Sequence, residues 1–267
     1  IKFKFVDMTD VSQVEAAITN RTKMLWIETP TNPTMSIIDI AGVVALTEGK
    51  DILTVADTTF ATPYLQNPLD LGCDIVLHSI TKYLGGHSDV VMGALVTSNE
   101  ELNTRLAFIQ KSCGAIPGPQ DAFLVLRGLK TLHLRMRQHC INGQAIAEFL
   151  DAHEKVSQVY YPGLATHKGH AIAARQMRNF GGMVSFTLEG DRIEDAVKLM
   201  SSTKLFALAE SLGGVESLIG HPATMTHASI PKAEREKAGL KDSLIRLSIG
   251  VEDTEDLIAD LAQALDA

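Results

Sequence analysis

The chain has 267 residues, of which 45% are hydrophobic and 21% charged, a composition typical of a globular protein with a sizeable core. Its net charge of −8 argues against nucleic acid and anionic membranes as partners. No apolar run reaches the ~18 residues of a membrane span, and no basic-then-apolar signal segment opens the chain. The three cysteines, Cys73, Cys113 and Cys140, lack the spacing of a metal site and fit a reducing cytosol, so we expect a cytoplasmic protein.

The first half of the chain alternates predicted strands and helices. Short apolar, β-prone runs predict strands at residues 24–28, 52–57, 74–78 and 90–96. After the first strand, Asp39 is predicted to cap a helix that runs through Leu46, and a short helix is predicted near Leu69. This alternation predicts an α/β fold with a mostly parallel sheet and right-handed crossovers.

Polar residues follow the ends of these strands. In an α/β sheet the carboxyl ends of parallel strands meet at one edge, and ligands dock there. The residues expected to gather at that edge are Glu28, Asn32, Asp57, Ser79 and Lys82. The edge is therefore the first place to look for a functional site.

A long helix is predicted over residues 118–152, because apolar residues recur there at helical spacing. It carries three charged residues that we interpret mainly as a solvated or interface face: Lys130, Arg135 and Arg137. We place a domain boundary inside this helix, with a large domain at 1–132 and a C-terminal small domain at 133–267. A helix at the boundary would join the two domains rigidly.

A second α/β unit follows the long helix. Strands are predicted at residues 156–161, 183–188 and 244–249. Helices are predicted at residues 168–177, 194–200 and 255–265. Between them, residues 205–227 are predicted to be irregular. No internal repeat or low-complexity tract interrupts the pattern.

Residues 78–89 (HSITKYLGGHSD) place Lys82 just past a predicted strand. Lysine is almost never fully buried unless it is paired or reacts. The hydroxyls of Ser79 and Thr81 are two residues apart, so in an extended chain they face the same way. Two hydroxyls beside a lysine suit pyridoxal 5'-phosphate (PLP), whose aldehyde is held as a Schiff base on lysine. An ordinary Lys-Gly-Gly loop explains these residues equally well.

Three stretches together resemble the cysteine and methionine metabolism family of PLP enzymes, which includes the trans-sulfuration enzymes. These stretches are residues 28–33 (ETPTNP), 79–89 (SITKYLGGHSD) and 208–217 (LAESLGGVES), within a resemblance that runs from about Lys23 to the C-terminus. The resemblance implies an aspartate-aminotransferase-like (type I) fold with a mostly parallel large-domain sheet and a smaller α+β C-terminal domain. It also implies PLP as cofactor, an amino-acid substrate and a homotetramer built as a dimer of dimers.

The resemblance assigns cofactor roles to residues of the first half. Lys82 would form the Schiff base and then shuttle protons, with a pKa lowered by burial near positive charge. Asp57 would pair with the pyridine nitrogen, and Asn32 would bond the ring's 3-hydroxyl. Two hydroxyls, those of Ser79 and Thr81, would bind the phosphate. Asp57 opens the run Asp-Thr-Thr-Phe where the family has Asp-Asn-Thr-Phe; Thr58 departs from the family, and Thr59 is expected at the cofactor.

The substrate residues implied by the resemblance lie in the second half. Arg246 stands amid apolar strand residues, and its guanidinium would bind the substrate α-carboxylate bidentately. The alternative is a buried structural ion pair. Ser211 would lie beside that carboxylate, and Thr226 would line the same wall. Glu210 suits the distal amino-acid arm of cystathionine. No histidine pair has metal-binding spacing, so no metal is expected.

Glu210 also bears on which family activity to expect, because cystathionine γ-lyases and γ-synthases carry glutamate at the equivalent position. Methionine γ-lyases and cystathionine β-lyases generally carry a non-acidic residue there. The leading expectation is γ-elimination of cystathionine to cysteine, 2-oxobutanoate and ammonia. The alternatives are γ-replacement on an activated homoserine ester and, less favoured, methionine γ-elimination. A non-catalytic fragment or subunit that retains a cofactor pocket is a different class of function.

One expected part of the family pattern is not found. In the family, the segment before the glutamate motif carries a Tyr-x-Arg that reaches a neighbour's phosphate, a Gly-Met phosphate turn and a tyrosine stacked on the ring. None of these motifs occurs before Glu28 in this sequence. We therefore expect that the N-terminal portion of the fold is absent from this sequence.

Overall fold

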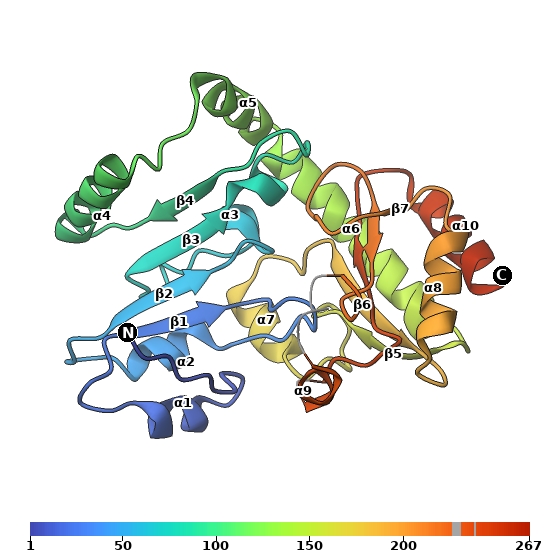
Figure 1. The fold of residues 1–267 in the computed structure, drawn as a ribbon, viewed down its shortest axis with the longest axis horizontal. Coiled ribbons are helices and arrows are strands. Elements are labelled where there is room, and N and C mark those ends of the chain that lie inside the picture. Colours follow the sequence, from blue (N-terminus) through green and yellow to red (C-terminus); the bar gives the residue numbers. More distant parts are fainter. Residues whose placement is uncertain (226–230, 238) are drawn as a thin grey trace.

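The computed structural model describes residues 1–225, 231–237 and 239–267. Its strands form two β-sheets, one of four strands in the first half and one of five in the second. Figure 1 shows the two sheets on opposite sides of the molecule, with the long helix α6 (Leu132–Asp151) running between them. Within the described residues, no helix combines the length and hydrophobicity that a membrane span requires.

The four-stranded sheet has the order β1-β2-β3-β4. Its strands are β1 (Met24–Glu28), β2 (Leu53–Asp57), β3 (Ile75–Ser79) and β4 (Gly93–Val96). The first three are parallel and β4 is antiparallel, which confirms the prediction of a mostly parallel sheet. Because Glu28 pairs with Asp57 in the parallel register, the carboxyl ends of β1 and β2 are level with one another.

The helices around this sheet match the predictions in part. They are α1 (Val11–Ala17), α2 (Ile40–Ala45), α3 (Thr62–Leu65) and α4 (Glu100–Cys113). Asp39 caps α2 as predicted, with its carboxylate accepting from the Gly42 amide at 3.2 Å. The predicted helix near Leu69 is wrong: α3 ends at Leu65, and residues 68–72 form turns that lead directly into β3. Neither α1 nor α4 was predicted.

The predicted single helix over residues 118–152 is two helices, α5 (Pro119–Leu129) and α6. The break has a physical cause at the Gly128 carbonyl, which accepts from the amide and the hydroxyl of Thr131 and from the Arg135 guanidinium. These bonds occupy the Gly128 carbonyl at the end of α5, so α5 ends there and does not continue into α6. The interpretation of Arg135 as a solvated or interface residue is also wrong, because this side chain is buried.

The five-stranded sheet has the order β5-β6-β9-β8-β7. Its strands are β5 (Val156–Tyr160), β6 (Met183–Leu188), β7 (Ala207–Leu208), β8 (Leu218–Gly220) and β9 (Ile245–Ser248). The remaining helices are α7 (His170–Gln176), α8 (Ile193–Ser202), α9 (Lys232–Lys237) and α10 (Thr254–Leu265). The three predicted strands and three predicted helices are confirmed. The short strands β7 and β8 lie inside the segment that was predicted to be irregular.

Two apolar clusters form much of the core, and one of them joins the two halves of the chain. One lies within the five-stranded sheet and its helices and includes Phe186, Ile245 and Leu257. The second joins residues from both halves, among them Tyr83 and Met136. Because α6 contacts β5, β6 and α10 as well as α3 and the turn after β3, it packs against both halves of the chain. The domain boundary between residues 132 and 133 stays a prediction.

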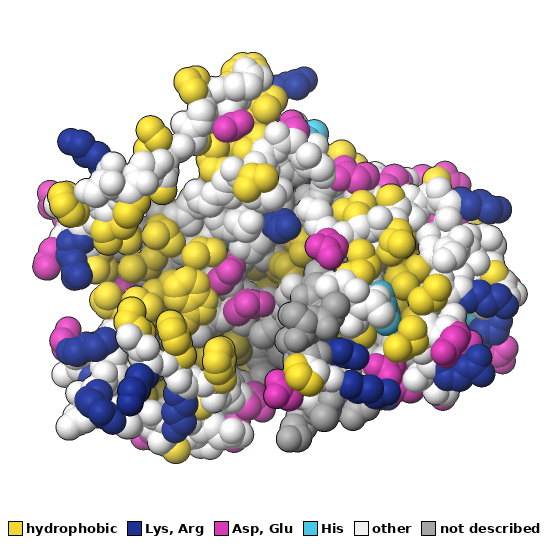
Figure 2. All heavy atoms as spheres, viewed as in Figure 1, with side chains coloured by type: hydrophobic (Ala, Val, Ile, Leu, Met, Phe, Trp, Pro, Cys, Tyr) yellow, Lys and Arg dark blue, Asp and Glu magenta, His cyan; other side chains and the backbone are white. Residues whose placement is uncertain are grey.

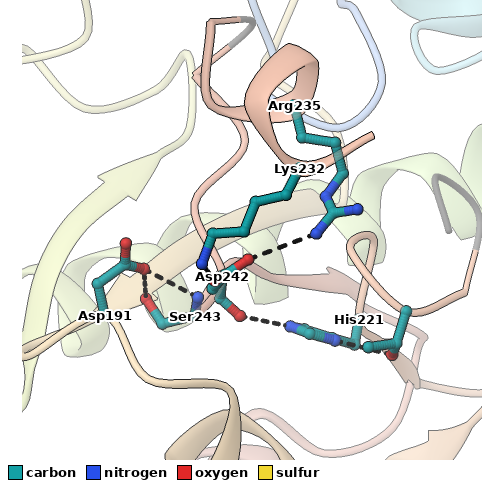
Figure 3. Close-up of polar contacts among 7 residues, drawn as sticks. Asp191, His221, Lys232, Arg235, Asp242 and Ser243 are labelled. Carbon is teal, nitrogen blue, oxygen red and sulfur yellow. Dashed lines mark hydrogen bonds and ion pairs between the residues drawn. The ribbon is translucent and has the colours of Figure 1, made fainter. Parts of the chain in front are cut away.

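The connection from β8 to β9 is fastened by a polar network (Figure 3). The Asp242 carboxylate accepts from Lys232 and Arg235 of α9, and the Asp242 carbonyl is 2.7 Å from His221 Nε2. The neighbouring Ser243 donates to Asp191 from its amide at 2.9 Å and from its hydroxyl at 2.8 Å. The network therefore ties α9 to the start of β9, the strand that carries Arg246.

Candidate active site

A cavity of about 530 Å³ lies at the carboxyl ends of β1, β2 and β3. This volume is in the range of small-molecule and cofactor sites. From the first half it is lined by all five residues that were expected at that edge: Glu28, Asn32, Asp57, Ser79 and Lys82. From the second half it is lined by Glu210, Ser211 and Arg246. The structure therefore brings two distant parts of the sequence to one site.

Lys82 lies in a five-residue π-helical turn, Ile80–Leu84, which follows β3 directly. Its backbone, at φ −92° and ψ −132°, is not helical, so the turn is kinked at the lysine. The Nζ atom is 3.5 Å from the Ser211 hydroxyl. Burial, and after it the positive charge of Arg246, lower the pKa of Lys82. A lowered pKa raises the fraction of neutral amine that can attack a carbonyl or take up a proton.

Asp57 ends β2 and is held in place by Thr59. Its Oδ1 accepts from the Thr59 amide at 3.0 Å and from the Thr59 hydroxyl at 2.7 Å. The Thr59 hydroxyl in turn accepts from the Ser79 amide at 2.9 Å, so it links the ends of β2 and β3. Within the described part of the chain, Asp57 Oδ2 has no hydrogen-bond partner and is left for a group in the cavity. Beside Thr59, the Thr58 hydroxyl is buried and makes no hydrogen bond to any described residue.

Glu28 is a second carboxylate at this edge. Its Oε1 accepts from the Asn32 amide at 2.9 Å, which shapes the proline-rich loop after β1. Burial raises the pKa of Glu28; the Asn32 hydrogen bond opposes the shift, and the charge of Asp57 adds to it. This bond holds the backbone of the loop at Asn32, which lines the cavity.

Arg246 projects from the centre of β9 and is only 4% exposed. Its Nη1 donates to Asn32 Oδ1 at 3.0 Å, across 214 residues of sequence. Its Nη2 donates to the backbone carbonyls of Glu210 at 2.6 Å and Ser211 at 3.2 Å. No described carboxylate forms an ion pair with it. A buried guanidinium held by neutral partners keeps its charge for an anion that enters the cavity.

One expected residue, Thr81, does not line the cavity. The Thr81 hydroxyl donates to the Met92 carbonyl at 3.2 Å and accepts from the Met92 amide at 3.0 Å. The expectation that Thr81 faces the same way as Ser79 assumed an extended chain, but β3 ends at Ser79 and the turn begins at Ile80. A cofactor role for Thr81 stays a prediction. Thr226 lies outside the described residues.

Apolar side chains complete the walls of the cavity, and sequence reasoning did not single them out. They are Pro30, Phe60 and Leu212. The sequence signals for them were weak: Pro30 and Leu212 stand in two of the family-like stretches, and Phe60 ends the run that Asp57 opens. In the described residues, no three His, Cys, Asp or Glu side chains are close enough together to hold a metal ion.

The residues present fit PLP chemically. An amine with a lowered pKa faces the cavity together with a carboxylate that has a free oxygen, a serine hydroxyl and an asparagine side chain. Lys82 would hold the aldehyde, Asp57 the pyridine nitrogen, Asn32 the 3-hydroxyl and Ser79 the phosphate.

Comparison with known proteins agrees with this chemistry. Residues 1–266 match the sequence model of a family described as Cys/Met metabolism PLP-dependent enzyme. The chain belongs to this family. Its cofactor is therefore PLP, and its fold is the α/β fold of that family.

The relatives carry different activity names. The chain is 54% identical to a cystathionine gamma-lyase of Dictyostelium discoideum over 266 residues, which are 100% of the chain and 68% of the relative. It is 54% identical to a cystathionine beta-lyase of Coxiella burnetii over 99% of the chain and 68% of the relative. It is 55% identical to a cystathionine gamma-synthase of Mycobacterium bovis over 99% of the chain and 67% of the relative.

A solved structure of cystathionine gamma-lyase from Lactobacillus plantarum, complexed with L-serine, superposes with a TM-score of 0.96. It is 46% identical, and the match covers 99% of this chain and 69% of that one. The family is thus an enzyme family of cysteine and methionine metabolism, while the names of the relatives divide among lyases and a synthase.

Proposed function

We propose that the protein is a PLP-dependent carbon–sulfur lyase that cleaves cystathionine by γ-elimination to cysteine, 2-oxobutanoate and ammonia. The observation that carries the proposal is the shared cavity, in which the Lys82 amine, the Asp57 carboxylate and the Arg246 guanidinium meet with Glu210 on the wall. These groups suit a substrate that has an α-carboxylate at one end and a second amino-acid group at the other.

When bound, PLP supplies a ring that withdraws the electron pair released from the substrate's α-carbon. Lys82 Nζ would hold the aldehyde, and as a neutral amine it would remove the α-proton of the substrate. Its lowered pKa favours the neutral form that this step needs. Asp57 Oδ2 would keep the pyridine nitrogen protonated, and Thr59 holds that carboxylate in place through Oδ1.

Arg246 orients the substrate. Its Nη2 already donates to the Glu210 and Ser211 carbonyls, but Nη1 carries a second N–H besides the one bonded to Asn32, and Nε has no hydrogen-bond partner among the described residues, so N–H groups remain for a substrate carboxylate. Ser211 lies between Arg246 and Lys82, since its carbonyl accepts from the first and its hydroxyl is 3.5 Å from Nζ of the second. Glu210 would attract the distal ammonium of cystathionine, and we assign Thr226 to the same wall.

Two other activities have a specific observation in their favour, because relatives of equal identity are named cystathionine gamma-synthase and cystathionine beta-lyase. A γ-synthase would replace the γ-substituent of an activated homoserine ester with the cysteine thiol. A β-lyase would break the other carbon–sulfur bond of cystathionine and give homocysteine, pyruvate and ammonia. Glu210 favours the two γ-type activities over the β-lyase, because γ-lyases and γ-synthases of the family carry glutamate at the equivalent position, and of these two we take the lyase direction as the proposal to be tested.

Product analysis separates the three activities. The purified protein, loaded with PLP, is incubated with cystathionine, and the keto acids are identified by chromatography and mass spectrometry. We expect 2-oxobutanoate and cysteine. Pyruvate and homocysteine as the main products would replace the proposal with β-elimination. Cystathionine formed from an activated homoserine ester and cysteine, without keto acid from cystathionine, would replace it with the synthase.

We further propose that the protein works in the cytoplasm as a homotetramer, built as a dimer of dimers. The support for assembly is the apolar surface of α4 and α5. Exposed large hydrophobic side chains there include Phe108, Ile109, Phe123 and Leu126. Surfaces of this kind on folded proteins commonly mark contacts with another chain.

A further inference from the structure

Arg135 is a buried cation that lies outside the cavity and has no part in the proposed chemistry. It stands near the start of α6 and is 6% exposed. Its guanidinium donates to the Tyr83 carbonyl at 2.6 Å, to the Gly128 carbonyl at 2.9 Å and to the Thr131 hydroxyl at 3.2 Å. No carboxylate of the described residues forms an ion pair with it. Burying an unpaired charge is costly, so these contacts to neutral oxygens need an explanation.

The surrounding backbone is shaped to admit this guanidinium. A Cβ atom at Gly86 would lie 2.3 Å from Arg135 Nη1, and Gly86 has a φ of +75° that disfavours other residues. A Cβ atom at Gly128 would lie 2.3 Å from the Gly85 carbonyl oxygen. Glycine at both positions lets the end of α5, the start of α6 and the chain after Lys82 approach one another closely.

Lys82 lies inside the turn Ile80–Leu84, and three carbonyls of this turn accept hydrogen bonds. The Ile80 carbonyl accepts from the Gly85 amide and the Lys82 carbonyl from the Gly86 amide, both at 2.8 Å. These two bonds are local. The third, from Arg135 to the Tyr83 carbonyl, is the one that joins the turn to the helices. The same guanidinium holds the last turn of α5, where carbonyls carry partial negative charge.

Tyr83 supports the same connection with its side chain. Its ring is fully buried and meets the ring of His139, one helical turn after Arg135 on α6, edge-on with centroids 5.0 Å apart. Both the backbone and the ring of the residue after Lys82 are therefore held by α6. On the other side, Lys82 Nζ faces Ser211 and the cavity.

We propose that Arg135 is a positioning residue for Lys82: it ties the Ile80–Leu84 turn to the end of α5 and thereby directs the Lys82 amine into the cavity. The proposal rests on the proposed role of Lys82 as the residue that binds PLP. Loss of the tie lets the turn shift, and misplacement of a reacting group by about 1 Å costs up to about a hundredfold in rate.

The test compares Arg135→Met, Arg135→Lys and the control Arg137→Met, which changes an exposed arginine of the same helix. Each variant is mixed with limiting PLP, the adduct is trapped with borohydride over a time course, and labelled peptides are mapped by mass spectrometry. The rate of labelling at Lys82 is normalised to folded protein, measured by circular dichroism. We expect Arg135→Met to slow it on the order of tenfold, Arg135→Lys to slow it less because an ammonium reaches fewer carbonyls, and Arg137→Met to match the parent.

The outcomes separate positioning from mere stability. If Arg135 only stabilises the fold, Arg135→Met lowers the melting temperature but leaves the labelling rate of folded protein unchanged, and the proposal is overturned. If Arg135→Met does not fold, Arg135→Lys decides, and parent-like labelling overturns the proposal. Because labelling does not depend on substrate, slower labelling at Lys82 supports Arg135 even if the protein fails to cleave cystathionine. That failure would count against the proposed function alone.

Discussion

Lys82 combines two properties at the scale of a single residue: its amine faces the cavity and its pKa is lowered by burial and by Arg246. We predict that borohydride reduction of the PLP-loaded protein labels Lys82, because a neutral amine at this position reacts with the aldehyde faster than a protonated surface lysine. Peptide mapping by mass spectrometry identifies the labelled residue. Lys23, an exposed lysine paired with Asp51, serves as the internal control. Label chiefly on another lysine would exclude Lys82 as the cofactor residue.

Arg246 offers a sharper test at the same scale, because its function depends on shape as well as charge. Arg246→Lys keeps the charge but loses the planar fork that holds Asn32 and a carboxylate together. We predict that kcat/KM for cystathionine falls on the order of tenfold or more while the cofactor's visible absorbance is retained. Arg192→Lys, at an exposed arginine, is the matched control. An unchanged kcat/KM in Arg246→Lys would remove Arg246 from the substrate site.

At the scale of elements, α6 is joined to the end of β9 by a histidine that must stay neutral. His139 is fully buried, its Nδ1 lies 2.7 Å from the Ile249 carbonyl, and burial lowers its pKa from 6.5 to about 4. Below pH 6.5 the unfolded chain binds this proton and the folded chain does not, so the free energy of unfolding decreases as the pH falls from about 6.5 to about 4. The contribution is on the order of 3 kcal/mol.

Urea unfolding at several pH values measures this effect. His139→Gln cannot take up a proton, so we predict that its stability depends less steeply on pH across this window than that of the parent. His133→Gln, at an exposed position of α6, is the control and keeps the parent's dependence. Equal pH dependence in His139→Gln and the parent would show that His139 does not carry the proton uptake.

The Asp260 carboxylate joins helix α10 to the segment that precedes β7. Asp260 is buried and accepts from the backbone amides of Lys204, Leu205 and Phe206, which lead into β7. We predict that Asp260→Ala lowers the free energy of unfolding by roughly 3 kcal/mol, because it leaves three amides without their acceptor. Chemical denaturation checks this value, with Asp256→Ala on the exposed side of α10 as a control expected to change it by less than about 1 kcal/mol. A similar loss in both variants would indicate a helix-wide effect instead.

At the scale of the whole molecule, Figure 2 shows hydrophobic side chains gathered over the part that carries the four-stranded sheet. Beyond the exposed residues of α4 and α5, Trp26 of β1 and Leu95 of β4 are also about half exposed. We predict a tetramer by light scattering coupled to size-exclusion chromatography. Phe123→Asp in α5 is expected to lower the mass, because a charge in an apolar contact is strongly unfavourable. Leu205→Asp, at an exposed residue of the five-stranded-sheet half, is the control. A monomeric parent would refute the prediction.

The sequence predicted most elements because their signals are local. The parallel strands β1 to β3 are short apolar runs, and α2 begins at a capping aspartate, so neighbouring residues suffice to define them. The residues of the cavity were predicted partly from strand ends and partly from the family resemblance. Resemblance was needed most for Arg246, because a structural ion pair is an alternative explanation for a lone arginine in an apolar strand.

The sequence by itself determined most of the strands and helices, and which polar groups stand at the strand ends around Lys82. Tertiary structure alone decided three things: that Arg246 meets Asn32 across 214 residues, that Thr81 bonds to Met92, and that Arg135 is buried against the Tyr83 and Gly128 carbonyls and so helps to divide the predicted long helix. Each of these depends on which oxygen lies within about 3 Å of a donor after packing. Periodicity reports which side of a helix or strand is apolar, but it carries no information about which backbone carbonyl a distant chain segment will present to a buried charge.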